Sequence, residues 1–192
     1  MDIRKTTNYI FELGVLKKFR HSGTKMAGVN NPDSIAEHAY RTAIIGYILA
    51  TMEKANPEKT AMICLLHDNA EARITDLHKV ARRYIDSSKA EMKAYEEQTE
   101  KLGKIGKKFL GLFKEYEHKK TREGIIARDA DMLETAFQAK EYLDLGYKAC
   151  QDWIRNVEKC LKTAGAKKLL KEMKKVEFTD WWRGLKNIDV GY

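Results

Sequence analysis

Leu65-Leu66-His67-Asp68-Asn69-Ala70-Glu71 is the part of this 192-residue chain from which its interpretation starts. An apolar run over 61–66 leads directly into a histidine and an aspartate that stand side by side. A helix that is apolar on nearly every face is buried, so we expect a buried helix over about 59–70. His67 and Asp68 then emerge where a polar pair needs partners, because burying an unpaired carboxylate costs several kcal/mol.

A second histidine lies on another predicted helix. Ser34 followed by Glu37 is a capping-box pattern, which predicts a helix from Ser34 to about Thr51. His38 and Arg41 lie on one face of this helix, beside its apolar stripe. We expect that stripe to face the core; it consists of Ala36, Tyr40, Ile44 and Ile48.

A distant carboxylate completes a candidate metal site. Asp131 lies beside the apolar seam of the longest periodic stretch, 115–145, which Gly146 ends. Two imidazoles and two carboxylates suit a divalent ion such as Mn²⁺, Fe²⁺, Co²⁺, Ni²⁺ or Zn²⁺ and leave positions for water and substrate. The sequence therefore predicts a metal site formed by His38, His67, Asp68 and Asp131.

The rest of the chain shows helical spacing of apolar residues and no strand alternation. We expect an all-α fold in a single domain over residues 1–192, with Trp181 and Trp182 packing on the body. The segment 20–31 is expected to be irregular, and three glycines leave the boundaries over 103–111 open. The further helices are expected at about 6–18, 87–102, 147–164 and 165–176. A shorter piece is expected over 72–84, with a turn or a helix start at Thr75-Asp76.

Composition limits the functional class. The hydrophobic share of 43% and the charged share of 33% are typical of a soluble globular chain. The net charge of +8 is spread rather than clustered, so we expect an anionic small-molecule ligand and no nucleic-acid partner. We expect no signal peptide and no membrane span. The three cysteines show no metal-type pairing and fit a reducing, cytoplasmic location.

Basic residues gather before the first histidine. Lys18, Arg20 and Lys25 lie in or next to the segment 20–31. One reading is a solvated basic loop. The other is a loop that faces the phosphate of a substrate near the metal site.

These motifs resemble the HD-domain phosphohydrolases, and among them the small 5′-deoxynucleotidase branch. The resemblance covers about residues 10–145. It rests on Ser34 to His38, on His67-Asp68 with Glu71 and Asp76 following, and on Asp131 followed by Glu134 and Gln138-Ala139-x-Glu141-Tyr142. One departure is clear: an Arg-Trp pair that contacts the nucleotide in some relatives is replaced here by Gly23-Thr24.

The resemblance implies a single HD-domain helical bundle, with a core over about 10–145 and extra C-terminal helices over about 147–192. It implies that His38, His67, Asp68 and Asp131 bind one divalent metal ion, with Mn, Co, Zn, Ni, Fe and Mg all open. It implies catalytic roles for Glu71 and Asp76. The candidate substrate-binding residues are Lys18, Arg20, Lys25 and Arg41.

We therefore expect an enzyme, a metal-dependent phosphomonoesterase that converts (deoxy)nucleoside 5′-monophosphates to nucleoside and phosphate. A homodimer is also expected, from the resemblance and from the three tryptophans of the C-terminal third. Alternatives are a phosphodiesterase, a nucleotide triphosphohydrolase, or a non-catalytic HD scaffold that binds nucleotide or nucleic acid. No Gly-rich phosphate loop supports the triphosphohydrolase.

Overall fold

The computed structural model describes residues 2–185 and is all-α over that range, apart from an isolated antiparallel bridge between Arg20 and Ser34. The predicted fold class is confirmed. The α-helices are α1 (Ile3–Leu13), α2 (Ser22–Met26), α3 (Ile35–Met52), α4 (Pro57–Leu66), α5 (Glu71–Ile74), α6 (Ser87–Thr99), α7 (Lys104–His118), α8 (Arg122–Asp144), α9 (Gln151–Cys160) and α10 (Ala164–Met173).

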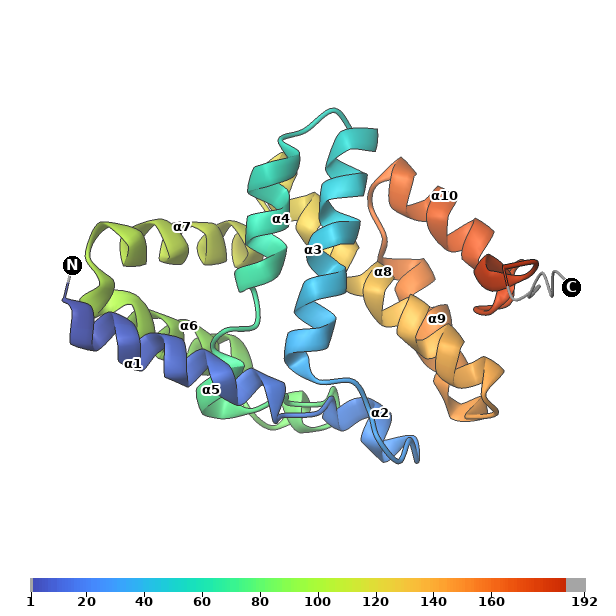
Figure 1. Cartoon of the computed structure of the whole chain (residues 1–192), viewed down its shortest axis with the longest axis horizontal. Coiled ribbons are helices and arrows are strands. Elements are labelled where there is room, and N and C mark those ends of the chain that lie inside the picture. Colours follow the sequence, from blue (N-terminus) through green and yellow to red (C-terminus); the bar gives the residue numbers. More distant parts are fainter. Residues whose placement is uncertain (1, 186–192) are drawn as a thin grey trace, which may run out of the picture.

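Helices α3, α4 and α8 form the centre of the molecule, with α1, α6 and α7 on one side and α9 and α10 on the other (Figure 1). They share one core, because residues from all three are fully buried against each other. Representative members are Leu49, Ile63, Cys64, Ile126 and Leu133. The candidate ligands, which lie on α3, on α8 and in the turn that follows α4, are therefore anchored in this shared core.

The start of α3 is as predicted. The hydroxyl of Ser34 accepts a hydrogen bond from the backbone N–H of Glu37 at 3.2 Å. The Glu37 carboxylate accepts one in return from the backbone N–H of Ser34 at 2.6 Å. This capping box satisfies two N–H groups that would otherwise lack partners at the helix end, and it fixes where the turn containing His38 begins.

The predicted core stripe of α3 is wrong. Tyr40 is 69% exposed, and Ile44 and Ile48 are 49% and 46% exposed. The physical reason is that α3 packs between α4 and α8, where close approach of the helices favours small side chains over long ones. The buried residues of α3 are Ile35, His38, Ala39, Thr42, Gly46, Leu49 and Ala50.

Other predicted boundaries also change. The segment 20–31 contains the short helix α2 instead of being wholly irregular. The long helix predicted over 115–145 is divided, because Lys119 adopts a left-handed conformation (φ 53°) that ends α7 before α8 begins. The helix predicted to end near Ala70 ends at Leu66, which leaves His67 and Asp68 in a turn.

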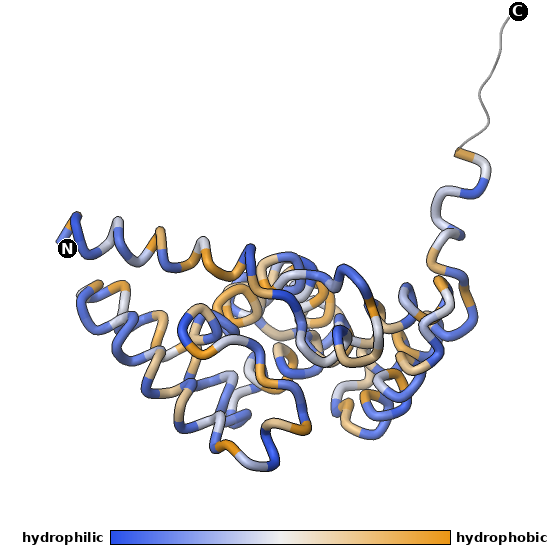
Figure 2. Tube along the Cα trace, turned by 90° about the horizontal axis from the view of Figure 1, so that it is seen from below, coloured by the Kyte–Doolittle hydropathy of each residue, from blue (hydrophilic) through white to orange (hydrophobic). Residues whose placement is uncertain are grey.

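The C-terminal aromatic residues differ from the prediction as well. The chain after α10 leads away from the helical body (Figure 2). Trp181 is 71% exposed, so the prediction that it packs on the body is wrong. Its ring instead contacts that of Trp182, with centroids 5.2 Å apart.

Within residues 2–185, no helix is both long enough and apolar enough to cross a membrane. The predicted division into a core over about 10–145 and C-terminal helices over about 147–192 stays a prediction.

Two glycines of α7 provide a test of the packing between α7 and the end of α6. A Cβ at Gly106 would lie 1.9 Å from the carbonyl oxygen of Thr99, whereas a Cβ at Gly111 would meet nothing within 4 Å. We expect Gly106→Ala to lower the free energy of unfolding by about 1–3 kcal/mol, the usual cost of overpacking. Gly111→Ala should raise it by about 0.5–1 kcal/mol, because alanine favours helix. Urea denaturation measures both; equal effects would contradict the close approach.

Candidate metal centre

His38, His67, Asp68 and Asp131 come together in the structure although they lie on different elements. The Nε2 atom of His67 lies 3.0 Å from Asp68 Oδ2 and 3.8 Å from Asp131 Oδ1. The Nε2 atom of His38 lies 3.6 Å and 3.4 Å from the same two oxygens. The two Nε2 atoms are 3.4 Å apart. Two nitrogens and two oxygens thus face one point between α3, α4 and α8.

The other ring nitrogen of each histidine is already engaged. His67 Nδ1 lies 2.6 Å from the carbonyl oxygen of Cys64, which can only accept, so this nitrogen carries the proton. His38 Nδ1 lies 2.5 Å from a carboxylate oxygen of Glu134. These contacts leave both Nε2 lone pairs directed at the shared point, the arrangement that metal-binding histidines require.

Asp131 is oriented in a similar way by residues on its outer side. Its Oδ2 accepts a hydrogen bond from the Tyr116 hydroxyl at 2.6 Å and lies 3.1 Å from Arg128 Nη1. Its Oδ1 therefore remains turned toward the histidines. The neighbouring Asp129 faces elsewhere, because it accepts hydrogen bonds from the backbone N–H groups of Lys162 and Thr163.

The electrostatics of this cluster favour a cation. Burial lowers the pKa of His67, but the charge of Asp68 and the contact with Asp131 outweigh burial and raise it to about 9. Burial also lowers the pKa of His38. The carboxylates of Glu134 and Asp131 outweigh burial and raise this pKa well above its usual value. Burial raises the pKa of Asp131, but the contacts with both histidines bring it well below its usual value. The raised pKa values of both histidines mean that positive charge is stabilised here, and the lowered pKa of Asp131 means that its carboxylate stays ionised. The donor set therefore fits a divalent ion.

The two carboxylates expected to be catalytic border this cluster. Glu71 is buried on α5, and its Oε2 has no hydrogen-bond partner within residues 2–185. Burial, reinforced by the charges of Asp68 and Asp76, raises the pKa of Glu71 well above its usual range. Its position, one turn after the His67-Asp68 pair, places an unsatisfied carboxylate beside the centre.

Asp76 is held by the beginning of α2. Its Oδ2 accepts hydrogen bonds from the backbone N–H of Ser22 at 2.6 Å and from the Ser22 hydroxyl at 2.8 Å. The preceding Thr75 has φ 63°. A β-branched residue in that conformation costs of order 1–3 kcal/mol and is typical of functional sites. The segment 20–31 therefore contacts the site through Ser22.

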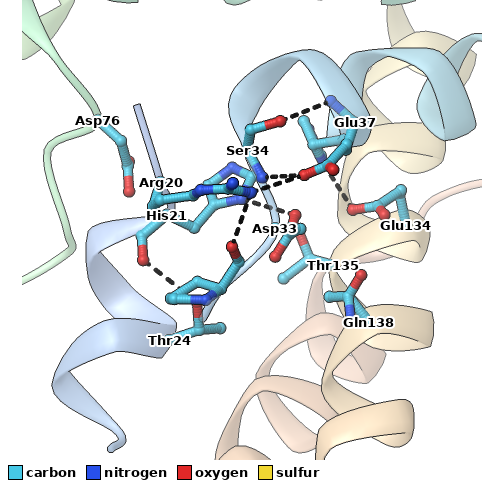
Figure 3. Close-up of polar contacts among 12 residues, drawn as sticks. Arg20, His21, Thr24, Asp33, Ser34, Glu37, Asp76, Glu134, Thr135 and Gln138 are labelled. Carbon is cyan, nitrogen blue, oxygen red and sulfur yellow. Dashed lines mark hydrogen bonds and ion pairs between the residues drawn. The ribbon is translucent and has the colours of Figure 1, made fainter. Parts of the chain in front are cut away.

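The four candidate substrate-binding residues point elsewhere in this structure. Arg41 donates to Glu134 at 2.8 Å and also contacts Gln138 and Glu141. Arg20 donates to Glu37 at 3.0 Å (Figure 3). Lys25 donates to a backbone carbonyl, and Lys18 is exposed. Arg20 and Arg41 line a cleft of about 520 Å³ that Glu134 also lines. The substrate roles of Lys18, Arg20, Lys25 and Arg41 stay predictions.

His21 is a site neighbour that was not among the predicted site residues. Its Nδ1 lies 2.8 Å from Asp33, and its ring meets the ring of His38 edge-on with centroids 4.9 Å apart. Figure 3 shows it between Asp76 and Asp33. The Gly23-Thr24 pair that follows does not lie beside His38. A Cβ at Gly23 would meet the ring of Trp153, and Thr24 is buried.

Other supporting residues were also absent from the predicted site. Glu134 had a signal, because it follows Asp131 by one helical turn and so shares its face. Arg128 had the same signal, because it precedes Asp131 by three residues. Tyr116 and Arg82 had no periodic signal that links them to the ligands. Their contacts join separate elements and become visible only in the folded chain.

Comparisons with known proteins agree with this geometry. A protein-family model described as "HD domain" matches residues 13–174. The chain is 31% identical to the 5′-deoxynucleotidase HDDC2 of Dictyostelium discoideum over 67% of this chain and 73% of that protein. It is 26% identical to the human 5′-deoxynucleotidase HDDC2 over 76% and 72% of the two chains. The solved structure of the PH0347 protein from Pyrococcus horikoshii OT3 is similar with a TM-score of 0.76 and 29% identity, over 88% of this chain and 98% of that one.

The contact between Glu134 and His38 yields a test of the metal centre. Glu134→Gln removes the charge that holds His38 in its orientation, and we expect metal affinity to fall by roughly 10- to 100-fold. Glu141→Gln is the matched control, because Glu141 also pairs with Arg41 but does not contact His38. Competition with a fluorescent chelator measures both. Equal affinities in the two variants would contradict a supporting role for Glu134.

Proposed function

Because this chain belongs to the HD domain family of metal-dependent phosphohydrolases, we propose that it hydrolyses (deoxy)nucleoside 5′-monophosphates to nucleoside and phosphate. The supporting observation is the convergence of His38, His67, Asp68 and Asp131 beside the buried carboxylate of Glu71. Such a site provides a position for one metal ion and one carboxylate that is not a ligand. Hydrolysis of a phosphomonoester uses both.

In this proposal His38, His67, Asp68 and Asp131 hold one divalent ion. When bound, that ion polarises a phosphoryl oxygen and lowers the pKa of a water molecule. The contacts of Cys64 with His67 and of Glu134 with His38 keep both imidazoles in the form that presents Nε2. The Tyr116 hydroxyl and Arg128 keep Asp131 turned inward. The chain thus holds its ligands in place before substrate arrives.

Glu71 and Asp76 act on the water and its proton. The Oε2 atom of Glu71 has no hydrogen-bond partner among the described residues, so it is available to a water molecule. A carboxyl group whose pKa burial raises is also able to hold a proton near neutral pH. Asp76 is directed by Ser22 and stays beside the centre as the second carboxylate. We assign proton transfer to Glu71 and orientation of the nucleophile to Asp76.

The class of substrate is supported by the similar proteins from Dictyostelium discoideum and human, which are 5′-deoxynucleotidases. The identity with them is modest, and the Arg-Trp pair of some relatives is absent here. A pocket that only crowds the 2′-hydroxyl discriminates by about 1–3 kcal/mol. We therefore propose a preference for deoxynucleotides and not their exclusive use.

Metal removal combined with a substrate panel tests this function. We expect EDTA to abolish release of phosphate and a single divalent ion to restore it, with kcat/KM for dAMP and dTMP above that for AMP by roughly 10-fold. The panel also contains dATP and bis(p-nitrophenyl) phosphate. Asp68→Ala serves as the control for contaminating phosphatase. If the triphosphate or the diester is turned over faster than every monophosphate, the proposed substrate class is incorrect.

We also propose that the chain forms a homodimer through the outer face of α3. Five large residues spaced along that face are between 44% and 69% exposed, whereas the opposite side of the helix is buried. They are Tyr40, Ile44, Tyr47, Ile48 and Met52. A contiguous apolar face on a soluble protein commonly marks an interaction surface.

Sedimentation velocity at micromolar concentration tests the dimer. We expect a mass of twice 22.2 kDa for the wild type. Ile48→Glu should shift it to the monomer, because a charge at this position would be buried in the interface. Phe11→Glu, on the exposed side of α1, is the matched control and should leave the dimer intact. A 22.2 kDa species for the wild type at all concentrations rules the dimer out.

A further inference from the structure

The carboxylate of Glu71 has a single side-chain partner among the described residues. That partner is Arg82, whose Nη2 lies 3.8 Å from Glu71 Oε1. The other oxygen, Oε2, is buried and has no hydrogen bond within residues 2–185. A buried carboxylate with so little support is costly, so the group that supports it determines where it points.

Arg82 is itself fixed by two stronger contacts. Its Nε donates a hydrogen bond to the carbonyl oxygen of Leu77 at 2.8 Å. Its Nη2 lies 3.1 Å from Oε1 of Glu91 on α6. Arg82 belongs to a short 3-10 turn, Ala81–Arg83, so the guanidinium links the segment 75–86 to both α5 and α6.

Glu91 has no part in the hydrolysis described above, yet it is only 9% exposed. Burial raises the pKa of Glu91 to about 7, against the opposing effect of the Arg82 charge. A surface helix such as α6 gains no stability from an unpaired buried carboxyl group. The ion pair with Arg82 supplies the partner that this buried carboxyl group needs.

We propose that Arg82, braced by Glu91, is a positioning residue that holds the Glu71 carboxylate in place and fixes the segment 75–86 over the metal centre. This inference rests on the proposed function, because it assigns Glu71 a role in proton transfer. Arg82 acts through Glu71 and does not contact the reacting atoms.

The two unequal distances explain how one guanidinium serves both carboxylates. At 3.1 Å, Glu91 forms the closer ion pair with Nη2. At 3.8 Å, Glu71 receives the charge of Arg82 but no hydrogen bond. The positive charge of Arg82 opposes the repulsion of Glu71 by Asp68 and Asp76. The Oε2 atom of Glu71 makes no hydrogen bond among the described residues and stays free for water. An arginine without the brace would move closer to Glu71 and occupy the position that the water needs.

The segment 75–86 is tied at two places. At one end, Asp76 accepts a hydrogen bond from Ser22. Near the other end, Arg82 forms an ion pair with Glu91 on α6. Loss of the second tie leaves the first as the main anchor of a segment whose backbone at Thr75 is strained. The brace therefore acts on the second catalytic carboxylate as well as on Glu71.

The chain offers a matched control in Arg83. It is the next residue of the same turn, is exposed, and makes no side-chain hydrogen bond or ion pair within the described part of the chain. We would compare Arg82→Ala, Arg82→Lys and Arg83→Ala for kcat and KM on whichever monophosphate the wild type turns over best. Metal content and Tm of each variant are measured alongside.

For Arg82→Ala we expect kcat to fall by about 10- to 100-fold with KM within about threefold of the wild type, the scale of a misplaced catalytic group. Arg82→Lys should recover part of kcat, because it restores the charge without the fork of donors. Arg83→Ala should match the wild type. A rise in KM with kcat unchanged would show Arg82 to be a substrate contact and would overturn the proposal, as would equal behaviour of Arg82→Ala and Arg83→Ala.

A double-mutant cycle tests the brace. If Arg82 and Glu91 act as a unit, Arg82→Ala with Glu91→Leu should be no slower than Arg82→Ala alone. Glu91→Gln, which keeps an acceptor oxygen and the shape of the side chain, should lose less and serves if Glu91→Leu fails to fold. Losses that multiply in the double variant would overturn the brace.

Hydrogen exchange provides a readout that does not depend on turnover. Amides of residues 75–86 should exchange faster in Arg82→Ala than in Arg83→Ala. If the wild type hydrolyses no monophosphate, the proposed function fails, and this comparison still decides the structural part of the inference. Equal exchange in the two variants would overturn it.

Discussion

Two imidazole nitrogens and two carboxylate oxygens, separated by 3.0 to 3.8 Å and withdrawn from water, form the constraint on which the rest of this structure depends. Like charges and lone pairs at such distances repel unless a cation compensates them. The fold meets this cost by placing the four groups on α3, on α8 and in the turn that directly follows α4. Because α3, α4 and α8 share one core, the ligands cannot separate without exposing apolar side chains.

Three of the four proposed ligands are oriented by a contact that comes from another residue. Glu134 orients His38, the Cys64 carbonyl orients His67, and Tyr116 orients Asp131. Glu134 is in turn paired with Arg41, so an arginine beside the first histidine acts on the opposite helix. The proposed metal ligands therefore face the centre, and the residues that contact them from behind fix their orientation. Substitutions of these supporting residues change the site without removing a ligand.

Sequence reasoning succeeded where the signal is local. The capping box at Ser34 and Glu37 depends on residues three apart, and it predicted where α3 begins. The fold class follows from helical spacing. The core stripe of α3 was misassigned because the helix is buried on two sides, so small residues such as Ala39 and Thr42 face the neighbours and large ones such as Tyr40 face outward. Arg82 and Tyr116 contact the site across elements, and no periodic pattern marks such contacts. Their side chains became relevant only when α5, α6 and α7 were placed.

Asp129 and Asp131 are two residues apart on α8, and their carboxylates serve different ends of the molecule. Two residues turn an α-helix by about 200°, so the two side chains point to nearly opposite faces. Asp131 faces the histidines, whereas Asp129 receives the N–H groups of Lys162 and Thr163 at the start of α10. The two contacts together fix the rotation of α8 about its own axis, because any rotation would break at least one of them. The C-terminal helices contribute none of the proposed ligands. They nevertheless help to fix the direction in which α8 presents Asp131 to the histidines.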